Sequence, residues 1–320
     1  MRVLISGGSG FIGGVLSYKL YDQKIKYAVI DNLSTSDKKN LPRKSIFYKG
    51  NINNKKLLLK IFNEFKPTHI VHLAASRDAR ESELNKQKYY INNIKNSQIF
   101  LDFFIKNKVK NFIFASTAAV YHKSSSGKKK ENKNVSPSNY YGKTKLIIEK
   151  YLLNCKKKFK LNIKIFRFFN VIGADDKLRS GSLPQKSQQL FNNLCKSMHY
   201  EKNFFIWGDN FKTYDGTCVR DYVDVRDLVK VVIFFIKTKK NYSNDIFNIG
   251  TNKGHSVLEI INLFKKIFKK YINYTVLKKR SGDPAHSTCS NSRLMKINKF
   301  KFSSLKKSIN LHYSFYKKNC

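Results

Sequence analysis

The stretch RVLISGGSGFIGG, residues 2–14, decides the fold that this sequence predicts. It begins with a short apolar run that is typical of a buried strand. Gly7, Gly10 and Gly13 follow this run and open a helical pattern. Glycines at this spacing permit a tight turn and let backbone N–H groups approach a phosphate, which the helix N-terminus stabilises. The stretch therefore predicts a strand–turn–helix unit that binds a dinucleotide, with a plain glycine loop as the alternative.

The alternation of strand and helix continues along the chain. Apolar runs indicate strands, and amphipathic stretches of helical period lie between most of them. We expect strands at Arg2–Ser6, Tyr27–Asp31, Ser45–Lys49, His69–Ala74, Asn111–Ser116 and Asn162–Phe169, and helices at Phe11–Tyr21, Lys55–Phe65, Asn85–Asn107 and Asn139–Cys155. This order predicts an α/β fold with a Rossmann-like doubly wound parallel sheet.

The rhythm changes after Asn170, where short strands, loops and helices follow. We expect residues 1–170 to form the dinucleotide-binding Rossmann domain and residues 171–320 to form mainly a smaller α/β region for the substrate. Residues 223–250 contain one more helical and one more strand pattern, which are expected to return to the first domain. The polar segment Lys123–Asn134 is expected to be a mobile surface loop.

The chain is strongly basic, with 63 Lys and Arg against 21 Asp and Glu and a formal net charge of +42. Only 10 of the basic residues are Arg, the residue favoured for bidentate phosphate and guanine contacts, and the lysines are scattered over the whole chain. We interpret the excess as a bias of composition at solvated positions. Weak binding to polyanions at low salt is expected, but no specific nucleic-acid partner.

Several observations limit the class of protein. The longest hydrophobic run, Val231–Ile236, is far shorter than the ~20 residues that span a bilayer. The five cysteines are odd in number and form no C-x-x-C pair, and the seven histidines show no metal-ligand spacing. We therefore expect a cytoplasmic protein with reduced thiols, no membrane segment and no metal site.

Asp31 ends the second expected strand, 18 residues after Gly13. An acidic residue at this place accepts hydrogen bonds from the adenosine ribose hydroxyls and repels a 2′-phosphate. The position therefore favours NAD over NADP, with an ordinary surface aspartate as the alternative.

Tyr141 and Lys145 are four residues apart and so share one face of a helix. A free phenol has a pKa of about 10, and a nearby ammonium, helped by a charged nicotinamide, brings it toward neutral pH. Thr117 follows the strand Asn111–Ser116, at the edge where open α/β sheets bind ligands. A solvated helix face is the alternative for the Tyr–Lys pair alone. The order of glycine turn, hydroxyl residue and Tyr-x-x-x-Lys resembles the extended short-chain dehydrogenase/reductase superfamily.

Within that superfamily the chain resembles the UDP-glucose 4-epimerase family over nearly its whole length. The resemblance rests on ISGGSGFIG (5–13), DNLS (31–34), HLAASRDARES (72–82), FIFASTAAVY (112–121), YYGKTK (140–145), RFFN (167–170), DGTCVRDYVDVRDL (215–228), FNIG (247–250), GHSVLEI (254–260) and RSGDPA (280–285). The DGTCVRDY run is far more specific than the glycine turn.

The resemblance implies a tightly held NAD and a UDP-sugar substrate. The implied NAD contacts are Gly7, Gly10, Phe11, Ile12, Gly13, Asp31, Asn32, Asn51, Ile52, Leu73, Ala74, Ala75, Arg77, Asn93, Thr117, Tyr141, Lys145 and Phe169. The implied substrate contacts are Thr117, Tyr141, Asn170, Ser182, Leu183, Phe205, Ile206, Trp207, Arg220, Arg280, Asp283 and Ser287. A homodimer through the helices Asn85–Asn107 and Asn139–Cys155 is also implied.

Two of the implied substrate contacts allow a second interpretation, and two of the implied cofactor contacts differ from the family. Arg220 and Arg280 offer planar forks for a diphosphate, or form structural salt bridges. The chain departs from the family at Asn51, where an Asp is usual, and at Arg77, where a Lys is usual. Neither departure removes the catalytic residues.

The resemblance implies NAD-dependent 4-epimerisation of UDP-glucose and UDP-galactose through a transient 4-keto sugar. Tyr141 takes the proton of the sugar 4-hydroxyl, Thr117 hydrogen-bonds that oxygen, and Lys145 supports the phenolate and the cofactor ribose. In the family, the residue at the position of Ser287 borders the 2-position of the hexose. The small size of Ser287 predicts that N-acetylated hexoses also fit.

Three alternatives stay open at this point. The first alternative is that the chain is a UDP-N-acetylglucosamine 4-epimerase, or an epimerase that acts on both the plain and the N-acetylated hexoses. A 4,6-dehydratase is disfavoured, because Ala118 and Ala119 after Thr117 cannot transfer protons. Outside the enzymes, a Rossmann protein binds NAD or nucleic acid without catalysis.

Overall fold

The computed structural model describes residues 1–121, 127–132, 135–184, 189–240, 242, 244–280 and 283–320. These residues contain a seven-stranded parallel sheet with the order β10-β6-β5-β4-β1-β2-β3. Its strands are β1 (Arg2–Ser6), β2 (Lys26–Asp31), β3 (Ile46–Lys49), β4 (His69–His72), β5 (Asn111–Thr117), β6 (Asn162–Phe168) and β10 (Ile246–Ile249). The predicted Rossmann-like doubly wound sheet is confirmed.

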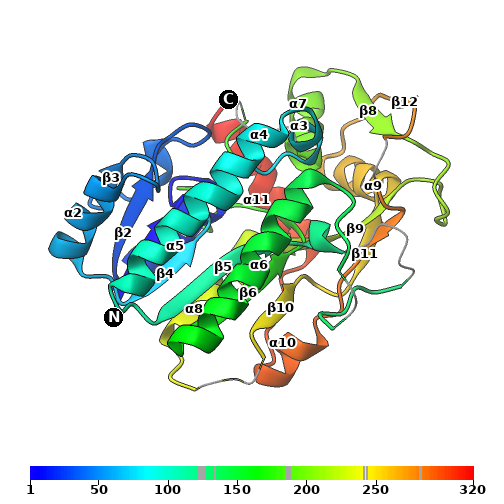
Figure 1. Cartoon of the computed structure of the whole chain (residues 1–320). Helices are drawn as coiled ribbons and strands as arrows, with labels where there is room; N and C mark the ends of the chain where they lie inside the picture. Colours follow the sequence, from blue (N-terminus) through cyan, green and yellow to red (C-terminus); the bar gives the residue numbers. More distant parts are fainter. Residues whose placement is uncertain (122–126, 133–134, 185–188, 241, 243, 281–282) are drawn as a thin grey trace.

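Helices cover both faces of this sheet (Figure 1). One face is covered by α1 (Phe11–Asp22) and α8 (Val225–Lys237). The other face is covered by α2 (Lys55–Phe65), α5 (Asn96–Lys106) and α6 (Tyr140–Phe159). The helix α8 and the strand β10 come late in the chain, and β10 extends the sheet by pairing with β6 in parallel.

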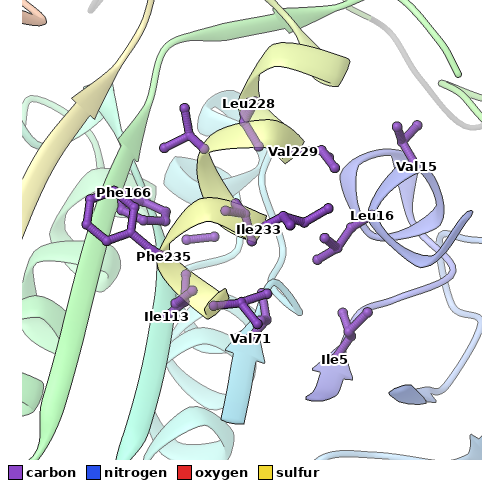
Figure 2. Close-up of a cluster of buried hydrophobic side chains, with 14 of the residues drawn as sticks. Ile5, Val15, Leu16, Val71, Ile113, Phe166, Leu228, Val229, Ile233 and Phe235 are labelled. Carbon is purple, nitrogen blue, oxygen red and sulfur yellow. The ribbon is translucent and has the colours of Figure 1, made fainter. Parts of the chain in front are cut away.

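The helices α1 and α8 pack side by side on this face of the sheet, as Figure 2 shows. Leu228, Val229 and Ile233 belong to the same buried cluster as Leu16 of α1. Ten of the thirteen residues of α8 are buried, which is typical of a helix that is covered on most sides. The helix therefore forms the centre of the core on this face.

A second region lies beside the carboxyl end of the sheet and has its own core. Its strands are β7 (Asn170–Ile172), β9 (Val219–Asp224), β11 (Gly254–Ser256) and β13 (His286–Ser287) in one sheet, and β8 (Phe204–Trp207) and β12 (Tyr274–Leu277) in another. Its helices are α7 (Leu190–Tyr200), α9 (Val257–Phe268) and α11 (Leu305–Lys318), whereas α10 (Ser292–Ile297) packs near β10. No helix in the described part of the chain has the length and apolar character needed to cross a membrane.

The expected single helix over Asn85–Asn107 is divided. It consists of α4 (Lys86–Tyr89), a π-helical segment η2 (Tyr90–Lys95) and α5, and it follows the short helix α3 (Ala79–Leu84). A π-helical turn contains an extra residue and so rotates the side chains that follow it. The apolar periodicity of the sequence does not reveal this change.

Of the segment Lys123–Asn134, expected to be a mobile surface loop, the structure describes residues 127–132, which form a loop with exposed residues at 127, 128, 130 and 132. Lys129 and Glu131 are buried. The Lys129 N–H donates to the Thr288 carbonyl at 2.8 Å, and Glu131 Oε1 accepts from the Asn248 N–H at 2.9 Å. The other residues of that segment, 123–126 and 133–134, lie outside the described residues.

Several helices end at a lysine in the left-handed conformation. Lys66 after α2 has φ +48° and Lys160 after α6 has φ +50°. Glycine is the favoured residue at such an end, because a Cβ costs about 1–2 kcal/mol there. The lysines at these ends agree with the interpretation that composition bias acts on solvated positions.

We expect Lys160→Gly to raise the thermal unfolding temperature, with a gain of about 0.5–1 kcal/mol, because the left-handed strain is relieved. Lys150→Gly in the middle of the same helix is the control and should cost about 1 kcal/mol. Thermal unfolding of both variants beside the wild type measures the two effects. A loss of stability in Lys160→Gly would contradict the prediction.

Candidate active site

A cleft of about 410 Å³ opens at the carboxyl ends of the parallel strands. Its walls come from the ends of six neighbouring strands, β6, β5, β4, β1, β2 and β3, and the turns after them, because the carboxyl ends of parallel strands meet at one edge of a sheet. All the expected cofactor contacts except Asn93 line it, namely Gly7, Gly10, Phe11, Ile12, Gly13, Asp31, Asn32, Asn51, Ile52, Leu73, Ala74, Ala75, Arg77, Thr117, Tyr141, Lys145 and Phe169.

Asn93 lies behind the wall of the cleft. Its side chain is buried, accepts a hydrogen bond from the Ser76 N–H at 2.8 Å and donates to the Ser76 carbonyl at 2.9 Å. It also donates to the hydroxyl of Thr144 at 3.1 Å. Asn93 thus fixes the loop after β4 against α6, whereas Asn92 and Asn96 line the cleft.

The glycine turn at the start of α1 leaves a helix N-terminus at the cleft wall. Gly7 has φ +73°, and a Cβ there would lie 2.7 Å from the backbone nitrogen of Ala74. Gly10 is the N-cap of α1, and no side chain caps this helix. The free N–H groups at the N-terminus of a helix attract an anion, so this turn fits a pyrophosphate.

Asp31 presents its carboxylate to the cleft in a fixed orientation. Its Oδ1 accepts hydrogen bonds from the Leu33 N–H and the Ser36 hydroxyl, both at 2.9 Å, and Oδ2 accepts from the Ser9 N–H at 3.0 Å. A carboxylate has about four acceptor positions, so it can still accept from ribose hydroxyls. A 2′-phosphate at this place would meet a like charge.

The first turn of α6 lies very close to the chain that follows β5. The N-cap Asn139 accepts a hydrogen bond from the Gly142 N–H at 2.8 Å. A Cβ on Gly142 would collide with the Ala119 carbonyl oxygen, so this approach requires glycine. As a result the phenol of Tyr141 hydrogen-bonds the hydroxyl of Thr117, the last residue of β5.

Three effects act on the pKa of the Tyr141 phenol. Burial raises the pKa, whereas the hydrogen bond with Thr117 and the positive charge of Arg77 lower it. Arg77 stands in the loop after β4 and lines the cleft. The sequence analysis gave the electrostatic role to Lys145 and placed Arg77 only at the cofactor, whereas in the structure the cation that lowers the pKa of the phenol is Arg77.

Lys145 follows Tyr141 by one helical turn and is buried. Its ammonium donates to the Ala115 carbonyl at 2.9 Å and lies 4.9 Å from the centre of the Phe114 ring. Burial lowers the Lys145 pKa to about 7, while the charge of Glu149 acts in the opposite direction. An ionisable group with a pKa near neutral pH is suited to proton transfer and to charge stabilisation in a cleft.

The expected substrate contacts begin beside these residues. Asn170 lines the cleft together with Thr117 and Tyr141. Ser182 and Leu183 line a smaller pocket whose wall also includes Gly10 and Arg77. Asn170 and residues 182–183 therefore lie beside residues that line the cofactor end of the cleft.

The remaining expected substrate contacts lie on the second region. The guanidinium of Arg280 lies 4.2 Å from the centre of the Trp207 ring. Arg220 donates to two backbone carbonyls, at 2.9 and 2.7 Å, and its Nη2 lies 3.9 Å from the Asp283 carboxylate. Ser287 of β13 pairs in register with Arg220 of β9. Both arginines are thus oriented by protein contacts.

The expected substrate contacts Phe205 and Ile206 are successive residues of β8, so their side chains point to opposite faces of the strand. Ile206 is buried in the core of the second region, whereas the Phe205 side chain is 49% exposed. Ile206 therefore supports the strand from within.

The structure also adds cleft residues that the sequence analysis did not single out. They are Ile30, Ser34, Thr35, Ser36, Gly50, Ser76, Asn92, Asn96, Ala115, Ser116, Phe168, Val171 and Gln189. Most of them neighbour an expected contact in the chain, so each motif could have been extended by a residue or two. Asn96 and Gln189 lie outside the quoted motifs, and only the folded chain brings them to the cleft.

Asp221 in the VRDY run has a structural role. Its buried carboxylate accepts hydrogen bonds from the N–H groups of Thr251 at 2.8 Å, Asn252 at 3.0 Å and Cys289 at 3.3 Å. It joins the turn after β10 to the segment after β13. The VRDY run is therefore distinctive in part because its aspartate holds these two segments of the chain together.

Residues 3–250 match the model of the NAD dependent epimerase/dehydratase family. The chain belongs to this family. It is 35% identical over 286 residues to a UDP-glucose 4-epimerase of Lactobacillus helveticus, an alignment that covers 89% of this chain and 87% of the relative. Among solved structures, a UDP-glucose 4-epimerase has a TM-score of 0.94 at 30% identity and covers 99% of this chain and 98% of its own. A UDP-glucose 4-epimerase from Brucella ovis in complex with NAD has a TM-score of 0.92 at 29% identity over 98% of both chains.

The residues of the cleft fit the NAD that this family uses. The uncapped N-terminus of α1 fits the pyrophosphate, and Asp31 fits the adenosine ribose. Tyr141 and Lys145 line the same cleft together with Thr117. Among the described residues, no group of three His, Cys, Asp or Glu side chains is placed to hold a metal ion.

We expect the cofactor-free protein to bind NAD and to bind NADP at least about tenfold more weakly, because Asp31 repels the 2′-phosphate. Calorimetric titration with both nucleotides measures the preference. Asp31→Asn should reduce it, whereas Asp37→Asn, a carboxylate outside the cleft, should leave it unchanged. Equal affinity of the wild type for both nucleotides would refute this role of Asp31.

Proposed function

We propose that this chain is an NAD-dependent 4-epimerase of UDP-hexoses, which interconverts UDP-glucose and UDP-galactose through a transient 4-keto sugar. The observation that carries the proposal is that Thr117, Tyr141 and Lys145 line one cleft, in which the phenol of Tyr141 lies beside the Thr117 hydroxyl and Arg77 adds positive charge. The similar proteins that are named UDP-glucose 4-epimerase support the substrate class.

In the proposed reaction Tyr141, as phenolate, takes the proton of the sugar 4-hydroxyl, and Thr117 hydrogen-bonds the same oxygen. Bound NAD supplies reversible hydride transfer at C4 of the sugar. Arg77 and Lys145 provide positive charge that offsets the cost of a buried phenolate. The keto sugar turns about its link to the diphosphate, and Tyr141 then returns the proton. No net oxidation results.

Arg220 and Arg280 are assigned to the diphosphate, because planar guanidinium groups bind phosphate oxygens in pairs. A firm hold on the diphosphate leaves the hexose free to present either face. We assign NAD to residues 1–170 together with 223–250, and the nucleotide sugar mainly to residues 171–320. This division is supported by the pairing of β10 with β6 and by the separate core of the second region.

A dehydratase is the nearest competing activity, and the residues after Thr117 oppose it. Ala118 and Ala119 form a short turn, η3 (Ala118–Val120), directly after β5. Elimination of water requires an acid and a base at the sugar, and neither alanine transfers a proton.

We also propose that the protein is a homodimer of the cytoplasm. Large apolar side chains are exposed on the helical segments that the resemblance assigns to the dimer: Tyr90, Ile91 and Ile147. Exposed apolar side chains that lie close together are typical of protein interfaces. All five cysteines are free thiols, which fits a reducing compartment.

The proposed activity is tested by conversion of UDP-galactose to UDP-glucose by the purified protein. We expect turnover in the wild type and a loss of about 10²- to 10⁴-fold in Tyr141→Phe, because the base is removed. Tyr140→Phe is the matched control, since Tyr140 is the neighbouring tyrosine of the same helix and does not line the cleft. Absence of conversion by the wild type, or full activity of Tyr141→Phe, would refute the proposal.

Ser287 provides a second prediction, on substrate breadth. It is partly buried beside Arg220 on neighbouring strands, and His286 is engaged with the Lys212 carbonyl at 3.3 Å. We expect the wild type to convert UDP-N-acetylglucosamine as well. Overpacking typically costs about 1–3 kcal/mol, so Ser287→Tyr should reduce kcat/KM for the N-acetylated pair by roughly ten- to a hundredfold. Equal rejection of that pair by wild type and variant would exclude Ser287 as the wall.

A further inference from the structure

The end of β5 holds three successive turns of α6. The three contacted residues of α6 follow one another at intervals of four and so lie on one face of the helix. Each of the last three residues of β5 contacts one of them. The pairs are Thr117 with Tyr141, Ala115 with Lys145, and Ser116 with Glu149.

Glu149 is also bound to the neighbouring strand. Its carboxylate accepts two hydrogen bonds from Arg167 of β6, from Nε at 3.0 Å and from Nη2 at 2.7 Å. The side chains are only 1% and 3% exposed. A bidentate pair of this kind fixes the plane and the position of the carboxylate. Glu149 therefore ties α6 to both β5 and β6.

The opposite side of Arg167 is satisfied by further buried groups. Its Nη1 donates to the Tyr121 hydroxyl at 3.0 Å, and that hydroxyl donates to Asn248 Oδ1 at 2.6 Å. The Asn248 N–H in turn donates to Glu131 at 2.9 Å. The charges of this network are paired within the protein, so Glu149 does not depend on water for its position.

Glu149 is the carboxylate that acts on the Lys145 ammonium. The other groups around Lys145 in the described structure are the Ala115 carbonyl, the Phe114 ring and His72 of β4. Burial lowers the His72 pKa to about 3, so this imidazole is neutral at neutral pH. Glu149 follows Lys145 by one turn on the same face of α6, and its negative charge opposes the lowering of the Lys145 pKa by burial.

We propose that Glu149 is a positioning residue of the reaction: it fixes α6 on β5 and places its negative charge one helical turn from the Lys145 ammonium at the end of the cleft. The proposal rests on the proposed function, which gives Tyr141 and Lys145 their roles. The competing explanation is an ion pair that only joins α6 to β6. The two explanations differ in what happens to Lys145 when the charge of Glu149 is removed.

The single variant Glu149→Gln would leave the charge of Arg167 buried and unpaired, which is strongly destabilising. The test therefore uses Glu149→Gln/Arg167→Gln, which removes both charges. We expect this protein to fold, since neutral replacement of a buried pair is tolerated far better than removal of one partner. Folding is measured by circular dichroism and thermal unfolding.

The decisive measurement is the titration of the Lys145 Nζ by NMR, with the signal assigned by its absence in Lys145→Met. Because Lys145 is charged below its pKa, loss of Glu149 should move the midpoint to lower pH by about one unit or more. The alkaline limb of kcat/KM against pH should move in the same direction. Glu149→Asp, which keeps the charge, should retain most of the wild-type midpoint.

A second buried pair provides the matched control. Arg226 binds Asp224 in a bidentate manner at 2.9 and 2.7 Å, at the start of α8 and outside the cleft. Asp224→Asn/Arg226→Gln should change stability without moving the Lys145 midpoint. An unchanged midpoint and pH profile in the Glu149/Arg167 variant would overturn the proposal. A wild type that converts no UDP-sugar would instead refute the function, while the titration would still decide the role of Glu149.

Discussion

The candidate site depends on how closely the first turn of α6 approaches the end of β5. Gly142 permits this approach, because any side chain there would meet the Ala119 carbonyl. The same approach brings Tyr141 to Thr117 and places Lys145 against the strand backbone one turn later. The loop after β4 and the glycine turn after β1 are positioned by the same sheet. One backbone contact therefore sets the geometry of the whole reacting end of the cleft.

Burial shifts the pKa values of Tyr141 and Lys145, the two groups proposed to react, in opposite directions. It raises the pKa of the Tyr141 phenol and lowers that of the Lys145 ammonium to about 7. Both shifts disfavour the charged pair that general base catalysis needs. Fixed charges compensate locally, with Arg77 beside the phenol and Glu149 beside the ammonium. The many surface lysines do not replace them, since salt screens exposed charges within about 10 Å.

The sheet, the glycine turn and most of the cleft could be predicted because they depend on residues that are neighbours in sequence. Asp31 and Thr117 end strands, and Tyr141 begins a helix, so their order alone places them at one edge. The burial of Glu131 depends on Asn248, 117 positions away, and no local pattern reports such a pairing. Asn93 likewise faces α6 instead of the cleft, because a π-helical turn shifts the phase of its helix.

The late position of α8 and β10 in the chain determines when the first sheet can be completed during synthesis. β10 is the edge partner of β6, and α8 covers the apolar face above β1, β4 and β5. Until Ile249 has left the ribosome, β6 has an open edge and that face lacks its helix. Open edges and uncovered apolar faces promote aggregation. The nascent chain therefore passes through a long interval in which its own fold does not yet protect the first sheet.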